Sequence, residues 1–189
     1  MRKLILAMQI SLDGFIAGPD GDMSWMKTDD EEDWHDLFEM LESVDLLVLG
    51  GKMYPEYRDY WKKCLTDPGH SENDVAYAKF AEKTKHIVFS NTITDPGWEN
   101  TEIVKAKAED EVKKIKQEPG KDIYLVGGAK LASSLIAAGL VDEYRLVINP
   151  AIIGSGKSFF RDQNTKHLLK PVETKILTSG IIIAKYCEP

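Results

Sequence analysis

Short apolar runs alternate with longer amphipathic stretches along most of the chain. The runs have strand length and no regular polar alternation, which is typical of strands buried on both faces of a parallel sheet. They occupy residues 3–10 (KLILAMQI), 45–51 (DLLVLGG), 85–91 (KHIVFSN) and 122–128 (DIYLVGG), with a shorter candidate at 101–105 (TEIVK). We therefore expect a central sheet built mainly from these segments.

The stretches between the runs carry apolar residues at helical spacing. Residues 28–44 begin with acids from Asp29 to Asp33, which suit a helix N-terminus better than a metal cluster. Five apolar residues follow on one helical face: Trp34, Leu37, Phe38, Leu41 and Val44. Further helices are predicted at 74–84, 108–118 and 130–140, and a short helix with a long loop at 52–73.

The C-terminal part changes character, because strands follow one another with few helical residues between them. They are predicted at 142–150, 171–180 and 181–187, with a hairpin bend at Ser179–Gly180. The whole pattern predicts an α/β fold with a mostly parallel sheet, helices on both faces and an antiparallel C-terminal hairpin. No repeat or linker divides residues 1–189, so we expect a single domain.

Composition narrows the possible partners and compartment. The chain has 24 Lys and Arg against 31 Asp and Glu, a net charge of -7, and no basic stripe, which disfavours nucleic acid and anionic membranes. Cys64 and Cys187 form no metal or redox motif, and we expect free thiols in a reducing compartment. The first apolar run is interrupted by Gln9 and lacks a signal-peptide cleavage region, which favours a cytoplasmic protein. The four histidines show no ligand spacing, so no metal site is predicted, and each is expected at the surface or beside a strand.

The segment Ala151–Ser158 (AIIGSGKS) resembles a relaxed phosphate-binding loop. A true loop of this kind lies between a strand and a helix, early in a parallel sheet. The residues after Ser158 show no clear helical pattern and reach Pro171 within a few turns. We therefore expect Gly154 and Gly156 to shape a tight connection at a sheet edge instead.

Two pairs of glycines mark a better phosphate site. LVLGG and YLVGG each end a buried strand with two glycines, and a helix is expected after each. Glycine allows a ligand to approach the backbone, and a helix start presents free N–H groups to an anion. Since ligands of open α/β sheets bind at the carboxyl ends of the strands, these turns predict a dinucleotide site of a non-Rossmann type.

Several segments occur together in the order found in one known family. They are SLDGFIAGPDGDMSWM (11–26), VLGGKMY, VFSNT, and YLVGGAKLASSLIAAGLVDEYRLVINPAIIGSGKSFF. With the closing strands, they make nearly the whole chain resemble the reductase domain of the riboflavin-pathway deaminase-reductase, which shares its fold with dihydrofolate reductase. The resemblance implies the three-layer fold of that enzyme, a nicotinamide cofactor (NADPH, with NADH possible), and a homodimer formed through the C-terminal strands.

The resemblance also assigns cofactor contacts by position. Gln9 ends the first strand near the nicotinamide, and Trp25 closes the mobile loop. The implied phosphate and ribose contacts are Gly50, Gly51, Lys52, Ser90, Asn91, Gly127, Gly128, Ala129, Lys130 and Leu131. In dihydrofolate reductases the second glycine pair is joined by a cis peptide, which is expected here too.

The chain also departs from the family pattern. Gly51 and Met53 replace the Arg and Thr of the first phosphate turn in dihydrofolate reductases, and Lys52 can supply a point charge in their place. Val126 stands where riboflavin reductases often carry a substrate-contacting glutamate, and KMYPEYRDYW replaces their Asp-Asp-Pro segment. The zinc deaminase half is absent, so the substrate need not be the riboflavin intermediate.

Hydride transfer needs positioning, a dry pocket and one proton donor. By position Asp30 is the candidate donor, with Asp29 and Asp33 as alternatives, although helix capping explains each of them equally well. Asp13 in the SLDG motif is a second candidate, and a turn-forming role before Gly14 remains open.

An aromatic group at Tyr54, Tyr57, Tyr60 and Trp61 fits either a heterocycle pocket or ordinary core and dimer contacts. The sequence thus predicts an NAD(P)H-dependent reductase of a pterin- or pyrimidine-like small molecule. The alternative is a binding module that keeps the fold and the dinucleotide without turnover.

Overall fold

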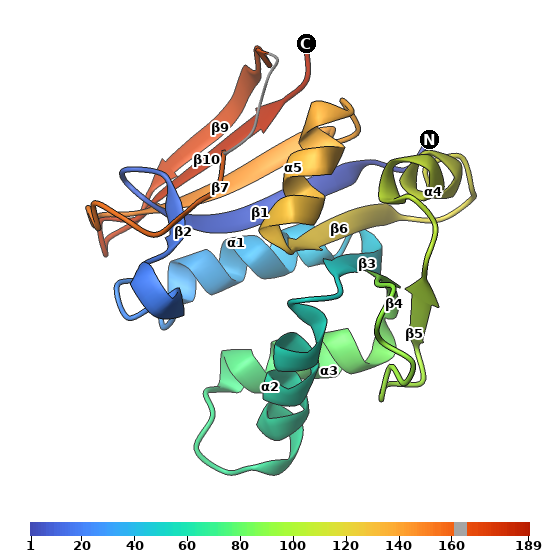
Figure 1. Ribbon diagram of the computed structural model, residues 1–189. Helices are drawn as coiled ribbons and strands as arrows, with labels where there is room; N and C mark the ends of the chain where they lie inside the picture. Colours follow the sequence, from blue (N-terminus) through green and yellow to red (C-terminus); the bar gives the residue numbers. More distant parts are fainter. Residues whose placement is uncertain (161–165) are drawn as a thin grey trace.

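An eight-stranded sheet forms the centre of the computed structural model, which describes residues 1–160 and 166–189 (Figure 1). Its strands, in spatial order, are β5 (Thr101–Val104), β4 (Lys85–Phe89), β3 (Val44–Gly50), β6 (Asp122–Gly127), β1 (Leu4–Ser11), β7 (Glu143–Asn149), β10 (Ile182–Cys187) and β9 (Lys170–Ile176). The first six strands are mutually parallel, and β10 runs antiparallel to both of its neighbours, β7 and β9. The predicted mostly parallel sheet with a C-terminal hairpin is therefore confirmed.

Helices cover both faces of the sheet, as predicted (Figure 1). One face carries α1 (Glu31–Leu41), α2 (Tyr54–Thr66) and α3 (Glu72–Lys83), whose buried side chains pack with Leu47 and Leu49. The other carries α4 (Ala108–Ile115) and α5 (Ala129–Ala137), which pack with Leu4 and Leu6. Strand β1 thus has α1 beneath one row of its side chains and α5 above the other, which places its last residues between the two layers.

Local chemistry explains where the first helices begin. The Asp30 side chain accepts a hydrogen bond from the backbone N–H of Asp33 and so caps α1. At α3, Ser71 and Asp74 form a reciprocal capping box. The region 52–73 differs from the prediction, because α2 runs for 13 residues and only a short connection separates it from α3. The aromatic side chains of α2 pack on one another and on α3. This packing stabilises α2 over a greater length than its alternation of aromatic and polar residues predicted.

The segment that resembles a phosphate-binding loop is a strand connection. Lys157–Ser158 form β8, which pairs with β2 (Phe15–Ala17) in a small antiparallel sheet. A Cβ added at Gly156 would collide with the carbonyl oxygen of Ala17, so this glycine permits the two segments to meet. No helix follows before residue 160, and the expectation of a tight connection is confirmed.

His86 corrects an expectation, because its ring is buried within β4 rather than placed at the surface. The residue is 1% exposed, and within the described part of the chain neither ring nitrogen has a hydrogen-bond partner. The rings of Tyr54, Tyr57 and Trp98 surround it. The aromatic residues that follow Met53 therefore build a core between α2, α3 and β4, and this core is what buries the histidine.

Candidate active site at the carboxyl edge of the sheet

The two glycine turns meet at the carboxyl ends of β3 and β6. A Cβ added at Gly128 would lie 3.2 Å from the Cα of Gly50, closer than an ordinary van der Waals contact. Gly127 and Gly128 have φ values of 144° and 89°, which L side chains rarely adopt. Glycine is therefore required at positions 127 and 128 by the backbone conformation, and at 128 also by the close approach to Gly50, so the two turns form one continuous rim.

The peptide bond between Gly127 and Gly128 is trans, as are all peptide bonds among the described residues, which corrects the expected cis bond. The two positive φ values turn the backbone sharply enough to bring it beside Gly50 without a change of isomer.

Ser90 extends this rim to β4. A Cβ at Gly51 would come within 2.6 Å of the Cβ of Ser90, and the backbone N–H of Gly51 donates to the carbonyl of Phe89 at 3.0 Å. The Ser90 hydroxyl accepts hydrogen bonds from the backbone N–H groups of Thr92 and Ile93, which holds the turn after β4. The rim therefore runs across three neighbouring strand ends, and Lys52 and Asn91 are exposed beside it.

Two helices begin at this rim without a side-chain cap. The first residue of α5 is Ala129, and neither Gly128 before it nor Met53 before α2 provides a capping side chain. The first N–H groups of a helix have no partner within the helix and carry the positive end of its dipole. Lys130 is exposed in the first turn of α5. The rim thus offers backbone donors and positive charge to an anion, and the residues present fit a diphosphate.

A buried polar chain lies next to the rim, at the ends of β1 and β7. Asn149 donates from Nδ2 to Oε1 of Gln9 at 3.0 Å, and Gln9 directs its Nε2 to Oδ2 of Asp33 at 3.4 Å. Since β1 and β6 are parallel with Leu6 opposite Leu125, continuing this register brings Gln9 level with Gly128. A carboxylate and an amide therefore lie one strand away from the second glycine turn.

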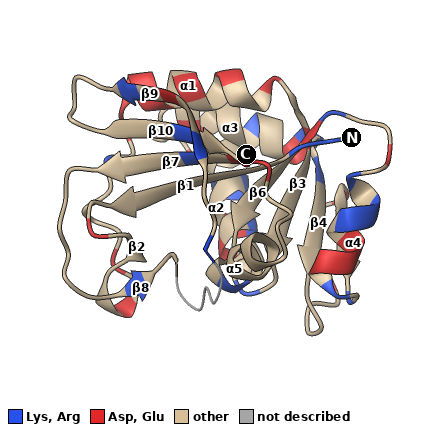
Figure 2. Ribbon diagram, turned by 90° about the horizontal axis from the view of Figure 1, so that it is seen from above, with Lys and Arg blue, Asp and Glu red and all other residues tan. Residues whose placement is uncertain are grey.

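Arg145 of β7 holds two carboxylates of α1 together. Its guanidinium donates to Asp33 at 2.7 Å and to Asp36 at 2.6 Å, and all three residues are buried. Asp36 receives two more cations, Lys175 at 2.7 Å and Lys185 at 2.8 Å. In Figure 2, acidic stretches of α1 lie beside basic stretches of β9 and β10. The positive charge around the pair is therefore concentrated on Asp36.

The unequal surroundings separate the pKa values of the two carboxyl groups. For Asp36, burial alone would raise the pKa, but hydrogen bonds from Lys175, Lys185 and Arg145 hold it well below its ordinary value. For Asp33, burial outweighs the attraction of Arg145 and raises the pKa. Such a separation is a common feature of acid-base sites, in which the group with the raised pKa is the candidate proton donor.

The acids favoured by position serve mainly in the local structure. Burial tends to raise the pKa of Asp30, but hydrogen bonds from Ser179 and the backbone N–H groups of the first turn of α1 lower it overall. The carboxylate of Asp13 accepts hydrogen bonds from the Ser11 hydroxyl at 2.6 Å and from the backbone of Gly154 at 2.8 Å. Asp13 therefore joins its own turn to the loop after β7. Neither carboxyl group has the raised pKa of Asp33.

The loop that carries Trp25 is fastened to the sheet just before α1. The indole N–H of Trp25 donates to the carbonyl of Asp22, and the backbone N–H of Lys27 donates to Oδ1 of Asn149 at 2.9 Å. The Lys27 ammonium contacts the carbonyl of Ser179. Trp25 itself is partly exposed, and its loop contacts the polar chain through the backbone of Lys27.

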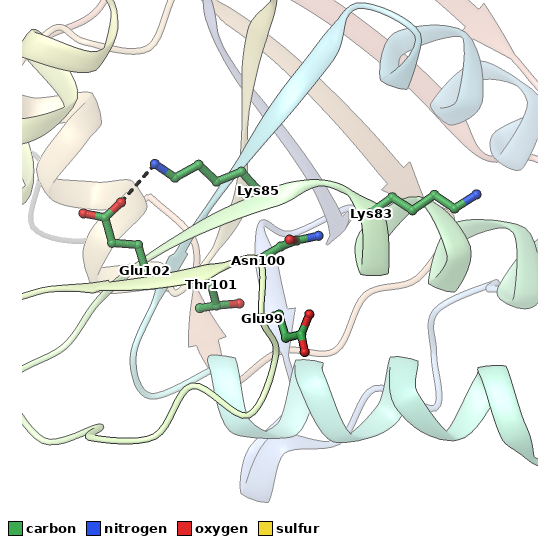
Figure 3. A pocket seen from close by; sticks show the side chains of 6 residues that line it. All are labelled: Lys83, Lys85, Glu99, Asn100, Thr101 and Glu102. Atoms are coloured by element: carbon green, nitrogen blue, oxygen red, sulfur yellow. Dashed lines mark ion pairs between the residues drawn. The ribbon is translucent and has the colours of Figure 1, made fainter.

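Surface hollows occur at other places. One is lined by Lys83, Lys85, Glu99, Asn100, Thr101 and Glu102. Figure 3 shows its lysine and glutamate side chains around the first residues of β4 and β5, with Lys85 paired to Glu102. It lies at the amino ends of these strands, opposite the glycine rim. A second lies between α1 and β9, around Asp36 and Lys175. Neither hollow is lined by a residue of the glycine rim.

Comparison with known proteins identifies the family. The model of the RibD C-terminal domain matches residues 2–183. The chain belongs to the RibD C-terminal domain family. Two proteins of Bacillus subtilis are similar to this chain in sequence. YyaP is 34% identical over 185 residues, covering 98% of this chain and 94% of YyaP, and YwjB is 26% identical over 178 residues, covering 92% of this chain and 91% of YwjB.

Solved structures show the same fold. A putative riboflavin biosynthesis protein from Shewanella sp. PV-4 superposes with a TM-score of 0.76 at 18% identity, over 99% of both chains. The deaminase and 5-amino-6-(5-phosphoribosylamino)uracil reductase of Thermotoga maritima gives 0.70 at 17% identity, over all of this chain and 57% of the other. Dihydrofolate reductase of Enterococcus faecalis, complexed with NADP(H), gives 0.63 at 14% identity, over 98% of this chain and 96% of the other.

The site residues assigned from the family resemblance did not include Arg145 or Asn149. Both lie in the run YRLVIN, where every second side chain points to the α1 face, and both are buried. The sequence did contain one sign of a site here: an arginine and an asparagine occur at inward-facing positions of an otherwise apolar strand. Buried polar groups need hydrogen-bond partners, so such residues predict a polar cluster. Among the described residues, no group of three His, Cys, Asp or Glu is arranged to hold a metal, and no helix is long and apolar enough to cross a membrane.

Proposed function

We propose that the protein is a reductase that uses a nicotinamide dinucleotide to reduce a flat, pterin- or pyrimidine-like small molecule. The observation that carries the proposal is the adjacency of two features at one sheet edge. A glycine rim with two uncapped helix starts lies across β3 and β6, and a buried carboxyl group with a raised pKa lies beside the end of β1.

The rim supports the cofactor half of the proposal. The backbone N–H groups at the start of α5 would bind the diphosphate, and Lys52 and Lys130 would add positive charge. The start of α2 contributes fewer donors, because Pro55 has no N–H. Because a Cβ at Gly51 or Gly128 would fill the space that the turns use, the cradle depends on glycine. With the exposed Lys52 next to the first turn, we propose NADPH as the preferred form.

The polar chain supports the chemical half. When bound, the cofactor supplies a hydride, and reduction of a C=O or C=N bond then needs one proton. Asp33 would hold this proton on Oδ2, because Oδ1 accepts from Arg145 at 2.7 Å, whereas the contact of Oδ2 with Gln9 is long, at 3.4 Å. Gln9 orients that oxygen, and Trp25 would exclude water from the edge.

The exposed edge strand β9 supports a homodimer as part of the proposal. β9 is an edge strand, and its Val172 and Ile176 side chains are 62% and 77% exposed. Unpaired edges with exposed apolar residues are suited to pairing with another chain. Sedimentation of the protein as a monomer at micromolar concentration would refute this part.

Binding and turnover of NADPH test the main proposal. Lys130→Glu places a carboxylate at the start of α5, where it competes with an anion for the free N–H groups, and we expect NADPH affinity to fall about tenfold or more. Lys79→Glu makes the same charge change on the exposed face of α3 and should leave the affinity within twofold. Affinity is measured from NADPH fluorescence, with NADH in parallel.

The possible results separate the candidate functions. Binding that Lys130→Glu weakens, together with NADPH oxidation by a member of a pterin and pyrimidine panel, supports the reductase. Tight binding without oxidation across the panel would favour a dinucleotide-binding module, for which the altered first phosphate turn at Gly51 and Met53 gives a reason. Absence of binding would reject both.

A further inference from the structure

The hydrogen bonds of the polar chain beside the glycine rim all run in one direction, which the backbone N–H of Lys27 determines. The backbone N–H of Lys27 can only donate, so the atom of Asn149 that faces it, at 2.9 Å, must be the carbonyl oxygen Oδ1. The amide nitrogen of Asn149 then faces Gln9 at 3.0 Å, and it can meet only an acceptor there. Gln9 must therefore present Oε1 to Asn149 and turn its Nε2 toward Asp33.

We propose that Asn149 is a positioning residue that fixes the orientation of the Gln9 amide, so that the backbone N–H of Lys27 determines which Gln9 atom faces Asp33. This inference rests on the proposed role of Asp33 as proton donor. Asn149 has no exposed surface, which leaves no water to replace either of its partners. Without the Lys27 N–H, the amides of Asn149 and Gln9 would be free to reverse together.

The two orientations of Gln9 have opposite effects on Asp33. With Nε2 toward the carboxyl group, Gln9 donates to the ionised form and keeps the pKa from rising further. With Oε1 toward it, Gln9 accepts from the protonated form and raises the pKa. The orientation that Asn149 imposes on Gln9 is thereby linked to the ease with which Asp33 releases its proton.

Other groups around Asp33 are the same in both orientations. The charged and titratable groups that face it come from β7, β6 and α1 itself: Arg145, Tyr124, Asp30 and Asp36. Lys175 of β9 and Lys185 of β10 contact Asp36 on the far side of the pair. A change at Asn149 leaves all of these in place, so a change in the titration of Asp33 would report the Gln9 amide.

The test is a titration of the Asp33 carboxyl carbon by NMR in the cofactor-free protein. Asn149→Leu is neutral and releases Gln9, and we expect the pKa of Asp33 to rise by about half a unit. Asn149→Asp offers Gln9 only acceptor oxygens and adds charge, so it forces the reversal, and we expect a rise of about one unit or more. Asn100→Asp, at the amino end of β5 far from the chain, makes the same substitution without effect on Asp33.

The basic limb of the pH profile of kcat/KM should move upward by the same amount as the titration, because the donor must be protonated to act. Gln9→Met removes the intermediate residue, and in that background Asn149→Leu should produce no further shift of Asp33. An unchanged pKa in both Asn149 variants would overturn the proposal. A shift in Asn149→Asp alone would also overturn it, because charge alone would then explain the effect.

Two measurements keep the inference testable if the Asn149 variants do not fold. The amide hydrogen of Lys27 should exchange slowly in the wild-type protein, and Gln9→Met by itself should shift the titration of Asp33. Fast exchange at Lys27 would overturn the inference. Because the titration needs no turnover, failure of the reductase proposal and failure of the positioning proposal give different results.

Discussion

The buried ring of His86 makes the stability of the fold depend on pH. Burial lowers the pKa of His86 from 6.5 to about 4, and a backbone contact with Thr84 offsets only part of this shift. Because the folded-state pKa lies below the unfolded-state value, the unfolded chain binds more protons as the pH falls. The contribution of the neutral ring is therefore fully present above pH 6.5, and it is lost progressively as the pH falls from there toward 4.

The magnitude follows from the two pKa values. At pH 5 the histidine of the unfolded chain is protonated about 30 to 1, whereas the buried ring is still mostly neutral. A factor of about 30 corresponds to about 2 kcal/mol, so acidification from pH 7 to pH 5 should cost the fold about that much through this residue alone. For a fold with ordinary stability this is a large fraction of the total.

Urea unfolding followed by tryptophan fluorescence at pH 7 and pH 5 measures this loss. His86→Leu keeps an apolar side chain among Tyr54, Tyr57 and Trp98 and removes the titration, so its stability should fall by about 2 kcal/mol less than that of the wild type. His35→Gln removes an exposed histidine of α1 and should behave like the wild type. If His86→Leu and the wild type lost equal stability between the two pH values, the reasoning from burial would be refuted.

Three further predictions concern the carboxyl edge. Arg145→Met leaves Asp33 and Asp36 buried around a missing cation and should cost about 3–5 kcal/mol in urea unfolding; a cost no greater than that of Lys185→Met would contradict the central place of the guanidinium. Gly51→Ala adds a Cβ 2.6 Å from that of Ser90 and should lower the free energy of unfolding by about 1–3 kcal/mol and weaken NADPH binding. Gly18→Ala is the control, because the nearest neighbour of its added Cβ lies at 3.4 Å, and it should cost less. Equal losses of stability would argue against the close approach at Gly51. Asp33→Asn should lower kcat about 100-fold or more with NADPH affinity within twofold, while Asp30→Asn retains the helix cap and most of the rate; the reverse pattern would assign the proton donor to Asp30.

The sheet and its edge could be predicted because they rest on local patterns. Apolar runs that end in paired glycines, such as the one ending at Gly50–Gly51, identify both the strand and the turn that follows it. The parallel order of these strands then places Gly50 and Gly128 at the same edge without any knowledge of side-chain contacts. The segment Ala151–Ser158 was excluded as a phosphate loop on the same grounds, because no helix was expected after it.

The choice among the acids could not be made from sequence. Asp30 and Asp33 differ by one helical turn, and only the packing of α1 on β7 decides that Asp33 is buried against Arg145 while Asp30 caps the helix. Arg145 is 112 residues away from Asp33 along the chain, and no local pattern connects them. His86 escaped prediction for a similar reason, because its burial depends on aromatic side chains of α2 and the loop before β5.

The ion pairs of Asp36 connect the last two strands of the chain to α1. Lys175 and Lys185 supply two of the three cations on Asp36, and they come from β9 and β10, the final elements of the chain. A chain that ended before Lys170 would leave a buried carboxylate with a single guanidinium shared between two acids. We therefore expect α1 to pack stably only after the last strands have been translated. Deletion of the hairpin formed by β9 and β10 should destabilise the whole fold, although the hairpin lies at one side of the sheet.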